Sequence, residues 1–353
     1  MTQATTMTFP RTIGMDLGIR RTSFCVLAPS GRRIHEGRLK TSKPDMLAFL
    51  AAQPTSRVVL EASGPCRWIA EIAEDCGHEV IVANPREFRL ICESHRKSDR
   101  NDARILAAFG QFRPQLLHPL KLRGTKCQIA RSTLAARAHA VRQRTLIINL
   151  IRAEVRNLGE SIDCSAATFH KRASACIPAR LRPVLEPLLE VLGVLTEAVA
   201  KYDCEVDRLC ETEFPETALL TQISGVGPNT ALSFVATIED PTRFPRSRDV
   251  GAYVGLVSKS RASGSSNPEL RISKRGDKHL RRLLVNAATY VCARGQDSDL
   301  KRFAQRIADR GGQAAKAKAR IAVARKLAVL LHRLLVTAEV YEPLRNHPQD
   351  IAA

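Results

Sequence analysis

Apolar and polar residues in the first third of the chain follow the short alternating pattern of β-strands. Five such segments, each bounded by turn residues or by a helical stretch, are predicted strands: residues 12–18, 21–28, 33–40, 57–61 and 79–83. Helical periodicity appears in residues 44–53 and 66–76, and again after Ser98, a residue type that favours the N-cap position. Hairpin strands followed by alternating helices and strands predict an α/β domain with helices on a mixed sheet.

The middle of the chain has a different period. In residues 121–158 and from about 181 to 213, apolar residues recur every three, four or seven positions, as in long helices. The first segment carries arginines, among them Arg142 and Arg144, whereas the second is rich in glutamates. This pair predicts an antiparallel helical hairpin with charge pairs between its helices. It suits oligomerisation or a grip on nucleic acid, and a plain folding spacer explains the pattern equally well.

Composition adds charge to this picture. The 353 residues exceed one ordinary core, and 55 Lys and Arg against 35 Asp and Glu give a formal net charge of +20. A chain this basic most often binds a polyanion, and nucleic acid is the first candidate. The 10 cysteines are scattered without a CxxC pair, which argues against a zinc ribbon and favours reduced thiols in the cytoplasm. Neither a membrane-spanning apolar run nor a secretory signal is evident, so no membrane partner is expected.

Four acidic residues stand where two strands end and one helix begins. Asp16 and Glu61 each follow strongly apolar residues, where an unpaired buried charge would be costly. Asp99 and Asp102 are three positions apart and therefore share a helix face. Carboxylate oxygens are the ligands that a hard dication such as Mg²⁺ prefers. The alternatives are ordinary acids near turns and an acidic first turn that complements the helix dipole.

Basic and glycine-rich motifs predict contacts to a nucleic-acid backbone. Residues 223–231 read as a helix, a glycine hairpin and a second helix, where backbone N–H groups can approach a phosphate; a tight turn is the alternative. Residues 258–267 predict an exposed loop, and a dense basic patch follows it into a helix. The predicted contacts are Lys97, Arg100, Arg142, Arg144, Gly225, Gly227, Lys274, Arg275, Lys278 and Arg281.

Three motifs together resemble a known family. The segments 13–18 (IGMDLG), 60–64 (LEASG) and 97–103 (KSDRNDA) are similar to the DEDD signature of insertion-sequence transposases with a RuvC-like, ribonuclease-H-fold domain. The resemblance implies that the four acids bind two Mg²⁺ ions, for which Mn²⁺ is a possible substitute. Two such ions, roughly 3.5–4 Å apart, clamp the attacking and leaving oxygens of an in-line phosphoryl displacement.

The C-terminal part resembles the second domain of the same transposases, which carries a nucleophilic serine just before a glycine. In residues 225–288 this position maps onto Ser263, followed by Gly264. A serine hydroxyl is a weak nucleophile and needs activation, which metals held by the four acids could supply. The family usually has a second glycine after the serine, whereas this chain has Ser265 and Ser266, so the choice among the three serines stays open.

These observations predict an α/β plus α protein of three parts. They are a RuvC-like nuclease domain in residues 1–115, a helical hairpin in 116–213, and a mostly helical transposase domain in 214–353. The resemblance implies a transposase or recombinase that acts on element ends and target DNA at the bacterial nucleoid. It also implies a structured guide RNA and a homo-oligomer, a dimer or a tetramer. Two alternatives remain: a hydrolytic junction-resolving nuclease and a non-enzymatic nucleic-acid-binding protein.

Overall fold

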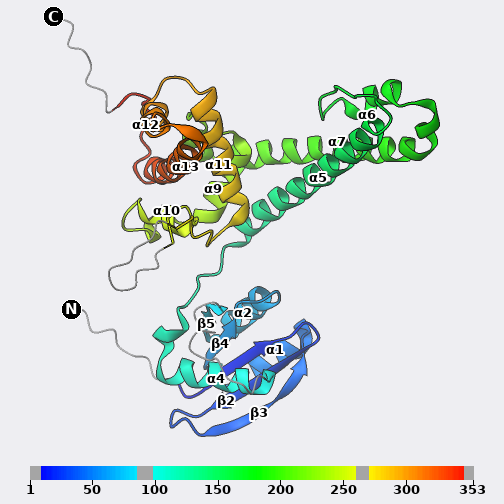
Figure 1. Ribbon diagram of the computed structural model, residues 1–353. Coiled ribbons are helices and arrows are strands. Elements are labelled where there is room, and N and C mark those ends of the chain that lie inside the picture. The colour runs from blue at the N-terminus through cyan, green and yellow to red at the C-terminus, as the bar shows by residue number, and fades with distance from the viewer. Residues whose placement is uncertain (1–8, 86–97, 260–269, 346–353) are drawn as a thin grey trace, which may run out of the picture. The chain divides into compact units, whose positions relative to one another are not determined.

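The computed structural model describes residues 9–85, 98–259 and 270–345, and the chain divides into two compact units at Leu122 and Arg123 (Figure 1). The helical hairpin belongs to the second unit together with the C-terminal helices. The finer division of residues 116–213 from 214–353 stays a prediction. Within the described ranges, no helix combines the length and the apolar character needed to cross a membrane.

The first unit is built on a five-stranded mixed sheet, which confirms the predicted fold class. Its strands are β1 (Thr12–Leu17), β2 (Arg21–Leu27), β3 (Arg33–Lys40), β4 (Arg57–Glu61) and β5 (Glu79–Ala83), in the spatial order β3-β2-β1-β4-β5. The first three strands form an antiparallel meander, and β4 and β5 run parallel to β1. The three connected strands need only turns between them, whereas each parallel strand follows a helix that returns the chain.

Helices cover both faces of this sheet. On one face, α1 (Lys43–Ala51) and α2 (Cys66–Asp75) pack against alternate residues of the strands, such as Ile13 and Met15. On the other face, α4 (Asp99–Phe112) covers β1, followed by the 3₁₀ turn η1 (Pro114–Leu117).

Close packing brings α4 directly onto the backbone of the sheet. Gly14 makes this possible, because a Cβ there would lie 2.2 Å from the carbonyl oxygen of Ala103 and 2.3 Å from the amide nitrogen of Ala107. Beside it, Cys25 of β2 is fully buried against the same two alanines. The contact leaves no room for a side chain between β1 and the helix, so it fixes the height of α4 above the sheet.

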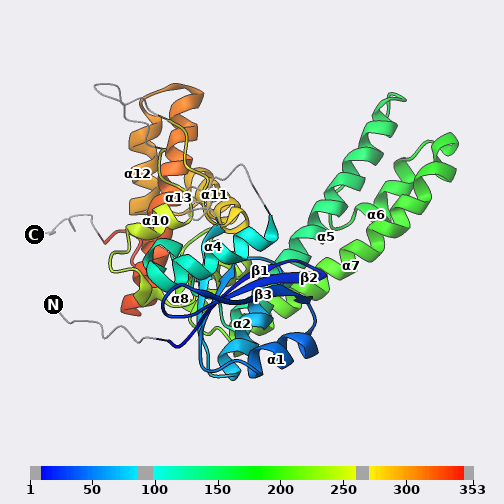
Figure 2. The same cartoon turned by 90° about the horizontal axis from the view of Figure 1, so that it is seen from below.

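The predicted hairpin is present. It consists of α5 (Thr125–Arg156) and α7 (Arg182–Thr212), which lie side by side in both views (Figures 1 and 2). One predicted charge pair between the helices is present, from Arg137 to Asp203. At the far end, the short helix α6 (Phe169–Arg172) closes a separate apolar cluster around the buried Phe169. The 3₁₀ turns η2 (Ala173–Cys176) and η3 (Ala179–Leu181) lead into α7.

The remaining helices form the core of the second unit. They are α8 (Thr217–Thr221), α9 (Pro228–Ile238), η4 (Pro241–Arg243), α10 (Asp249–Tyr253), α11 (Lys278–Ala293), α12 (Asp299–Ala308) and α13 (Gly312–Thr337). Helix α9 is buried at nine consecutive positions, from Thr230 to Ile238, as expected of a helix surrounded by others. The core extends to Leu134 of α5 and Val206 of α7, which explains why the hairpin belongs to the same unit.

Candidate active site and nucleic-acid contacts

The two strand acids lie side by side on one face of the sheet. Asp16 is the penultimate residue of β1 and Glu61 is the last residue of β4. These strands are parallel with Met15 opposite Leu60, so the next residue of each, an acid, comes at the same end of the sheet. Residues two positions earlier, Gly14 and Val59, pack against α4, and strand alternation therefore places both acids on the α4 face.

The two helix acids extend toward the same end. Ser98 caps α4 as predicted, with its hydroxyl oxygen accepting the backbone N–H of Asn101 at 3.3 Å. The buried residues of α4, among them Ala103 and Leu106, mark the helix face that packs on the sheet. Asp99 and Asp102 each stand four positions before one of these residues, so they lie on the same face. Helix α4 runs antiparallel to β1, because Thr12 bonds Gln111 near the helix end whereas Gly14 lies against Ala103. Its first turn therefore lies toward the Asp16 end of the strand.

Arginine side chains surround this end of α4. Arg38 of β3 donates to the hydroxyl of Ser23 at 3.3 Å and to the carboxylate of Asp99 at 3.4 Å. Ser23 is the residue opposite Asp16 in the β1–β2 pairing. Arg38 thus links the edge strand β3, the neighbouring strand and the first turn of the helix.

A second cluster fixes α4 to β3. Glu36 accepts two hydrogen bonds from Arg104, at 2.7 and 2.8 Å, and also pairs with Arg100 at 3.3 Å and Arg33 at 3.2 Å. The bonds from Arg104 lower the pKa of Glu36 to about 2, and the charges of Arg100 and Arg33 act in the same direction. Sequence reasoning missed Glu36 and Arg38, because charged residues on an edge strand resemble a solvated surface.

The four acids suit a hard dication by their chemistry. All their ligand atoms are carboxylate oxygens. Asp16 of β1 and Glu61 of β4 lie on the sheet face that α4 covers, and Asp99 and Asp102 lie on α4 itself. In the structure as it stands, however, no three His, Cys, Asp or Glu side chains of the described residues are grouped closely enough to hold one ion. Asp99 is 69% exposed and paired with Arg38, so it would have to exchange this partner to join a metal site.

Ser263, Ser265 and Ser266 lie outside the described residues, but the base of their loop is described. Ser258 and Ile272 form an antiparallel bridge, and the N–H of Lys259 donates to the carbonyl of Arg271 at 3.0 Å. The N–H of Ser273 donates to the carbonyl of Val257 at 2.7 Å. The predicted serine loop therefore leaves from and returns to one short two-stranded ribbon.

The glycine hairpin before α9 has a packing role at its first glycine. Gly225 has φ +91°, and a Cβ there would lie 3.0 Å from Tyr290 Cδ1 and 3.1 Å from the carbonyl oxygen of Ala287. Both backbone conformation and close approach to α11 require glycine here. Gly227 is the N-cap of α9 and faces open space, so it fits the predicted phosphate contact better than Gly225 does.

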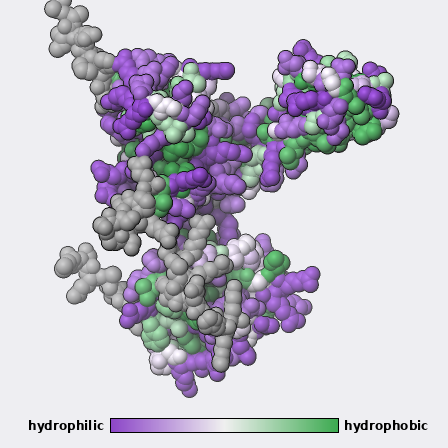
Figure 3. All heavy atoms as spheres, in the orientation of Figure 1, coloured by the Kyte–Doolittle hydropathy of each residue, from purple (hydrophilic) through white to green (hydrophobic). Residues whose placement is uncertain are grey.

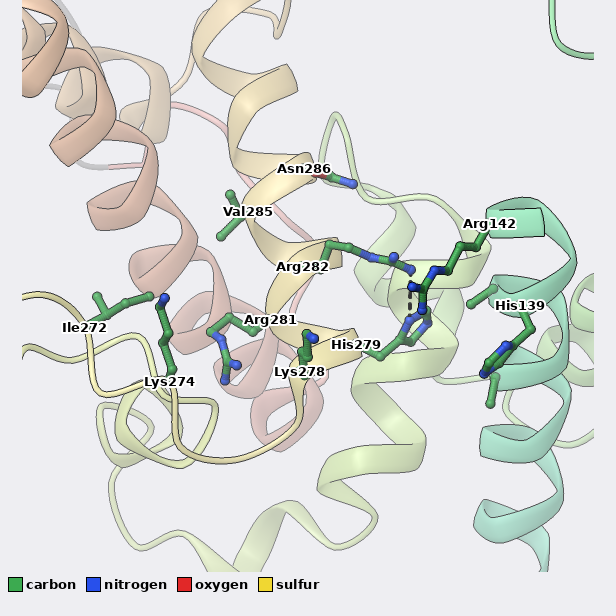
Figure 4. Close-up of a pocket in the computed structure, with 12 residues that line it drawn as sticks. His139, Arg142, Ile272, Lys274, Lys278, His279, Arg281, Arg282, Val285 and Asn286 are labelled. Atoms are coloured by element: carbon green, nitrogen blue, oxygen red, sulfur yellow. Dashed lines mark hydrogen bonds between the residues drawn. The ribbon is translucent and has the colours of Figure 1, made fainter. Parts of the chain in front are cut away.

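Four of the predicted basic contacts come together. Arg142 of α5, Lys274 in the segment before α11, and Lys278 and Arg281 in the first turn of α11 line one hollow of about 600 Å³ (Figure 4). The same hollow includes His139, His279 and Arg282. The sequence places His279 and Arg282 in the dense basic patch, but it does not show that this patch meets His139, because α5 and α11 are far apart in the chain.

The other predicted basic contacts are dispersed. Arg144 and Arg275 do not line this hollow, and the Arg144 Nε is buried without a hydrogen-bond partner among the described residues. Arg100 is engaged by Glu36, and Lys97 lies outside the described residues.

Two segments of the chain, one starting in each structural unit, match models of known protein families. Residues 13–158 match a family model described as "Transposase", the DEDD domain of the IS110 type. Residues 217–305 match the model of the transposase IS116/IS110/IS902 family. The first match contains all four acids, and the second contains the glycine hairpin, the serine loop and the start of α11.

Curated relatives are similar over most of their length. The transposase for insertion sequence element IS1328 of Yersinia enterocolitica is 31% identical over 281 residues, 78% of this chain and 82% of the relative. The transposase for insertion sequence element IS1111A of Coxiella burnetii is 26% identical, covering 93% of this chain and 90% of the relative. A probable family 20 transposase of Pseudomonas aeruginosa is 26% identical, covering 87% of this chain and 91% of the relative.

Proposed function

The chain belongs to the IS116/IS110/IS902 family of insertion-sequence transposases, and from this premise we propose that it cuts and rejoins DNA strands with its four acids and a serine. A transposase is an enzyme whose substrate is DNA, and a DEDD domain implies the use of divalent metal. The observation that carries the proposal is the placement of Asp16, Glu61, Asp99 and Asp102 at one end and on one face of the sheet.

The four acids together would hold two divalent cations, Mg²⁺ with Mn²⁺ as a possible substitute. Bound metal would polarise the scissile phosphate and lower the pKa of an attacking hydroxyl. The close contact of Gly14 with α4 holds the helix acids at a fixed height above the strand acids. Arg38 and Arg100 lie at the start of α4, where they could hold phosphates of the cleaved strand, and we propose the same role for Lys97, which lies outside the described residues.

We propose Ser263 as the nucleophile, with Ser265 and Ser266 as the alternatives. Its hydroxyl oxygen would form a bond to the scissile phosphorus, and the departing strand end would take the proton as it leaves as a free hydroxyl. A hydroxyl of a second strand can later displace the serine, so the bond energy of the phosphodiester is retained. The ribbon at Ser258 and Ile272 would present this loop to the DNA.

Partners beyond DNA are part of the same proposal. The net charge of +20 supports binding of a structured guide RNA from the element in addition to its two DNA ends and target. The hairpin supports a dimer or tetramer, since apolar side chains lie exposed along it among polar ones (Figure 3). These are Ile129, Leu146, Leu150, Val184, Val191 and Val194.

The proposed metal site is tested by removing one carboxylate. We expect Asp102→Asn to abolish cleavage of element-end DNA in Mg²⁺ while leaving its binding largely unchanged, because the amide is a poorer ligand of nearly equal shape. The matched control is Asp75→Asn at the end of α2, on the opposite face of the sheet. Cleavage by Asp102→Asn at the rate of the control would contradict the four-carboxylate site.

The hydrolytic nuclease is distinguished by its products. Hydrolysis leaves free strand ends, whereas serine attack leaves DNA covalently joined to protein, which a denaturing gel separates. We expect an adduct that disappears in Ser263→Ala. An adduct that persists there and disappears in Ser265→Ala would move the assignment, and cleavage without any adduct would favour the nuclease.

A further inference from the structure

The hollow between α5 and α11 is lined by cations from three separate segments of one unit. Arg142 extends from α5, Lys274 lies between the ribbon and α11, and Lys278, Arg281 and Arg282 belong to α11 (Figure 4). Among the residues that the structure describes, no Asp or Glu lines the hollow, so five cationic side chains border it without a carboxylate partner there. Such a concentration of charge attracts an anion, and phosphate groups are the obvious class.

The wall of the hollow is not simply basic. Ala135 and Ala138 form part of it on α5, and Val285 forms part of it on α11. Small apolar side chains leave a flat surface that a duplex backbone, which is polar along its whole outer edge, cannot use. A planar aromatic group can cover such a surface and remove it from water.

His279 adds a planar ring inside the hollow. Its Nδ1 lies 3.2 Å from an Arg282 nitrogen, and because a guanidinium only donates, Nδ1 accepts and carries no proton. Burial first, and then the charge of Arg282, lower the pKa of His279, so the ring is neutral near pH 7 with its hydrogen on Nε2. A neutral ring among five cations offers a stacking surface and one donor, as nucleobases require.

Size and shape restrict the ligand further. A volume of about 600 Å³ is that of a small-molecule pocket, in which one nucleotide fits. The bases of a duplex are stacked inside it and cannot enter a pocket, whereas an unpaired base can turn outward and stack on protein side chains.

We propose that this hollow binds one unpaired nucleotide of a single strand, with its base on His279 and the Ala138 wall and its phosphates on Arg142, Lys278 and Arg282. The inference rests on the proposed nucleic-acid function and deepens it. Ile272, which borders the hollow, belongs to the ribbon that carries the serine loop, and Lys274 follows that ribbon with its N–H donating to the carbonyl of Gly255 at 3.1 Å. A strand held there would be unpaired next to the loop that is proposed to attack it.

The test compares ligands of equal charge that differ in their bases. Fluorescence anisotropy would measure binding of the full chain to oligothymidylate and to an abasic deoxyribose-phosphate strand of the same length, about 12 nucleotides. We expect oligothymidylate to bind between about fivefold and 150-fold tighter, the range that one stacked base contributes. Oligouridylate in a parallel series distinguishes RNA from DNA as the source of the nucleotide, and a preference for bases in either series supports the proposal.

Variants that fill the hollow locate the base. Ala138→Leu should remove the preference for bases while leaving abasic binding unchanged, because no cation is lost. Ala135→Leu should also remove the preference for bases, and because Ala135 is exposed, the larger side chain does not disturb folding. The control is Asn149→Leu, exposed on α5 beyond the hollow. Retention of the preference in both filling variants would overturn the proposal.

The outcomes separate this inference from the function on which it rests. Equal binding of oligothymidylate and the abasic strand would overturn the nucleotide site while leaving nucleic-acid binding in place. If the chain bound none of these strands and no duplex DNA of the same length, both the nucleotide site and the proposed nucleic-acid function would be overturned.

Discussion

Single residues decide how firmly the first turn of α4 is held. Glu36 collects Arg33, Arg100 and Arg104 around one carboxylate, and the hydrogen bonds from Arg104 lower its pKa from 4.5 to about 2. The folded protein therefore binds this proton more weakly than the unfolded chain does. Stability from this group is fully present above about pH 4.5 and is lost as the pH falls toward 2.

Replacement of this carboxylate should show that pH dependence directly. We expect Glu36→Gln to be less stable than the unmodified protein at pH 7, with a gap that narrows as the pH falls from 4.5 toward 2. Urea unfolding at a series of pH values measures the gap. A difference that stays constant across the series would mean that Glu36 contributes through packing and not through its charge.

Whole elements determine whether the four acids share a site. Helix α4 supplies two of them, and its position over β1 depends on the absence of a side chain at Gly14. The sheet supplies the other two at the ends of parallel neighbours. A change of a few tenths of an ångström in the height of α4 would therefore move one pair of ligands relative to the other.

A single methyl group tests this dependence. Gly14→Ala should destabilise the protein by about 1–3 kcal/mol, the usual cost of overpacking, and should reduce cleavage because α4 is pushed away from the strand. Gly64→Ala is the control, since a Cβ there meets nothing within 4 Å. Chemical denaturation and DNA cleavage would be measured for both. Equal stability of the two variants would show that α4 relaxes without cost.

Elements with a strong local pattern were predictable from the sequence, and contacts between distant residues were not. The strand at 57–61 and the start of α4 after Ser98 are confirmed, because alternation and capping are local signals. The four acids could be proposed since each stands at the end of such an element. The pairing of Glu36 with Arg104 joins residues 68 positions apart, and the hollow joins α5 to α11, so neither leaves a trace in any short window.

At the scale of the whole molecule, charge sets how nucleic acid is bound. The net charge of +20 attracts nucleic acid whatever its base sequence, whereas the hollow gathers five of the 55 Lys and Arg side chains at one place. Each phosphate that a cation neutralises releases counterions and makes affinity fall with salt.

The salt dependence should therefore identify individual contacts. We expect Lys278→Ala to reduce the slope of log affinity against log salt by about 0.7 to 0.9, the amount for one phosphate. Lys201→Ala, at an exposed position on the acidic helix α7, should leave the slope unchanged. Affinities measured over a salt series give both slopes. An unchanged slope for Lys278→Ala would remove that lysine from the contact surface.

The thiol of Cys25 can report how often α4 separates from β1. It is fully buried beneath Ala103 and Ala107, and burial, followed by the nearby charge of Glu36, raises its pKa. A thiol-alkylating reagent can reach it only while the helix is lifted from β1, and only the thiolate reacts. The alkylation rate of Cys25, read by mass spectrometry peptide by peptide, therefore reports how often the two helix acids part from the two strand acids.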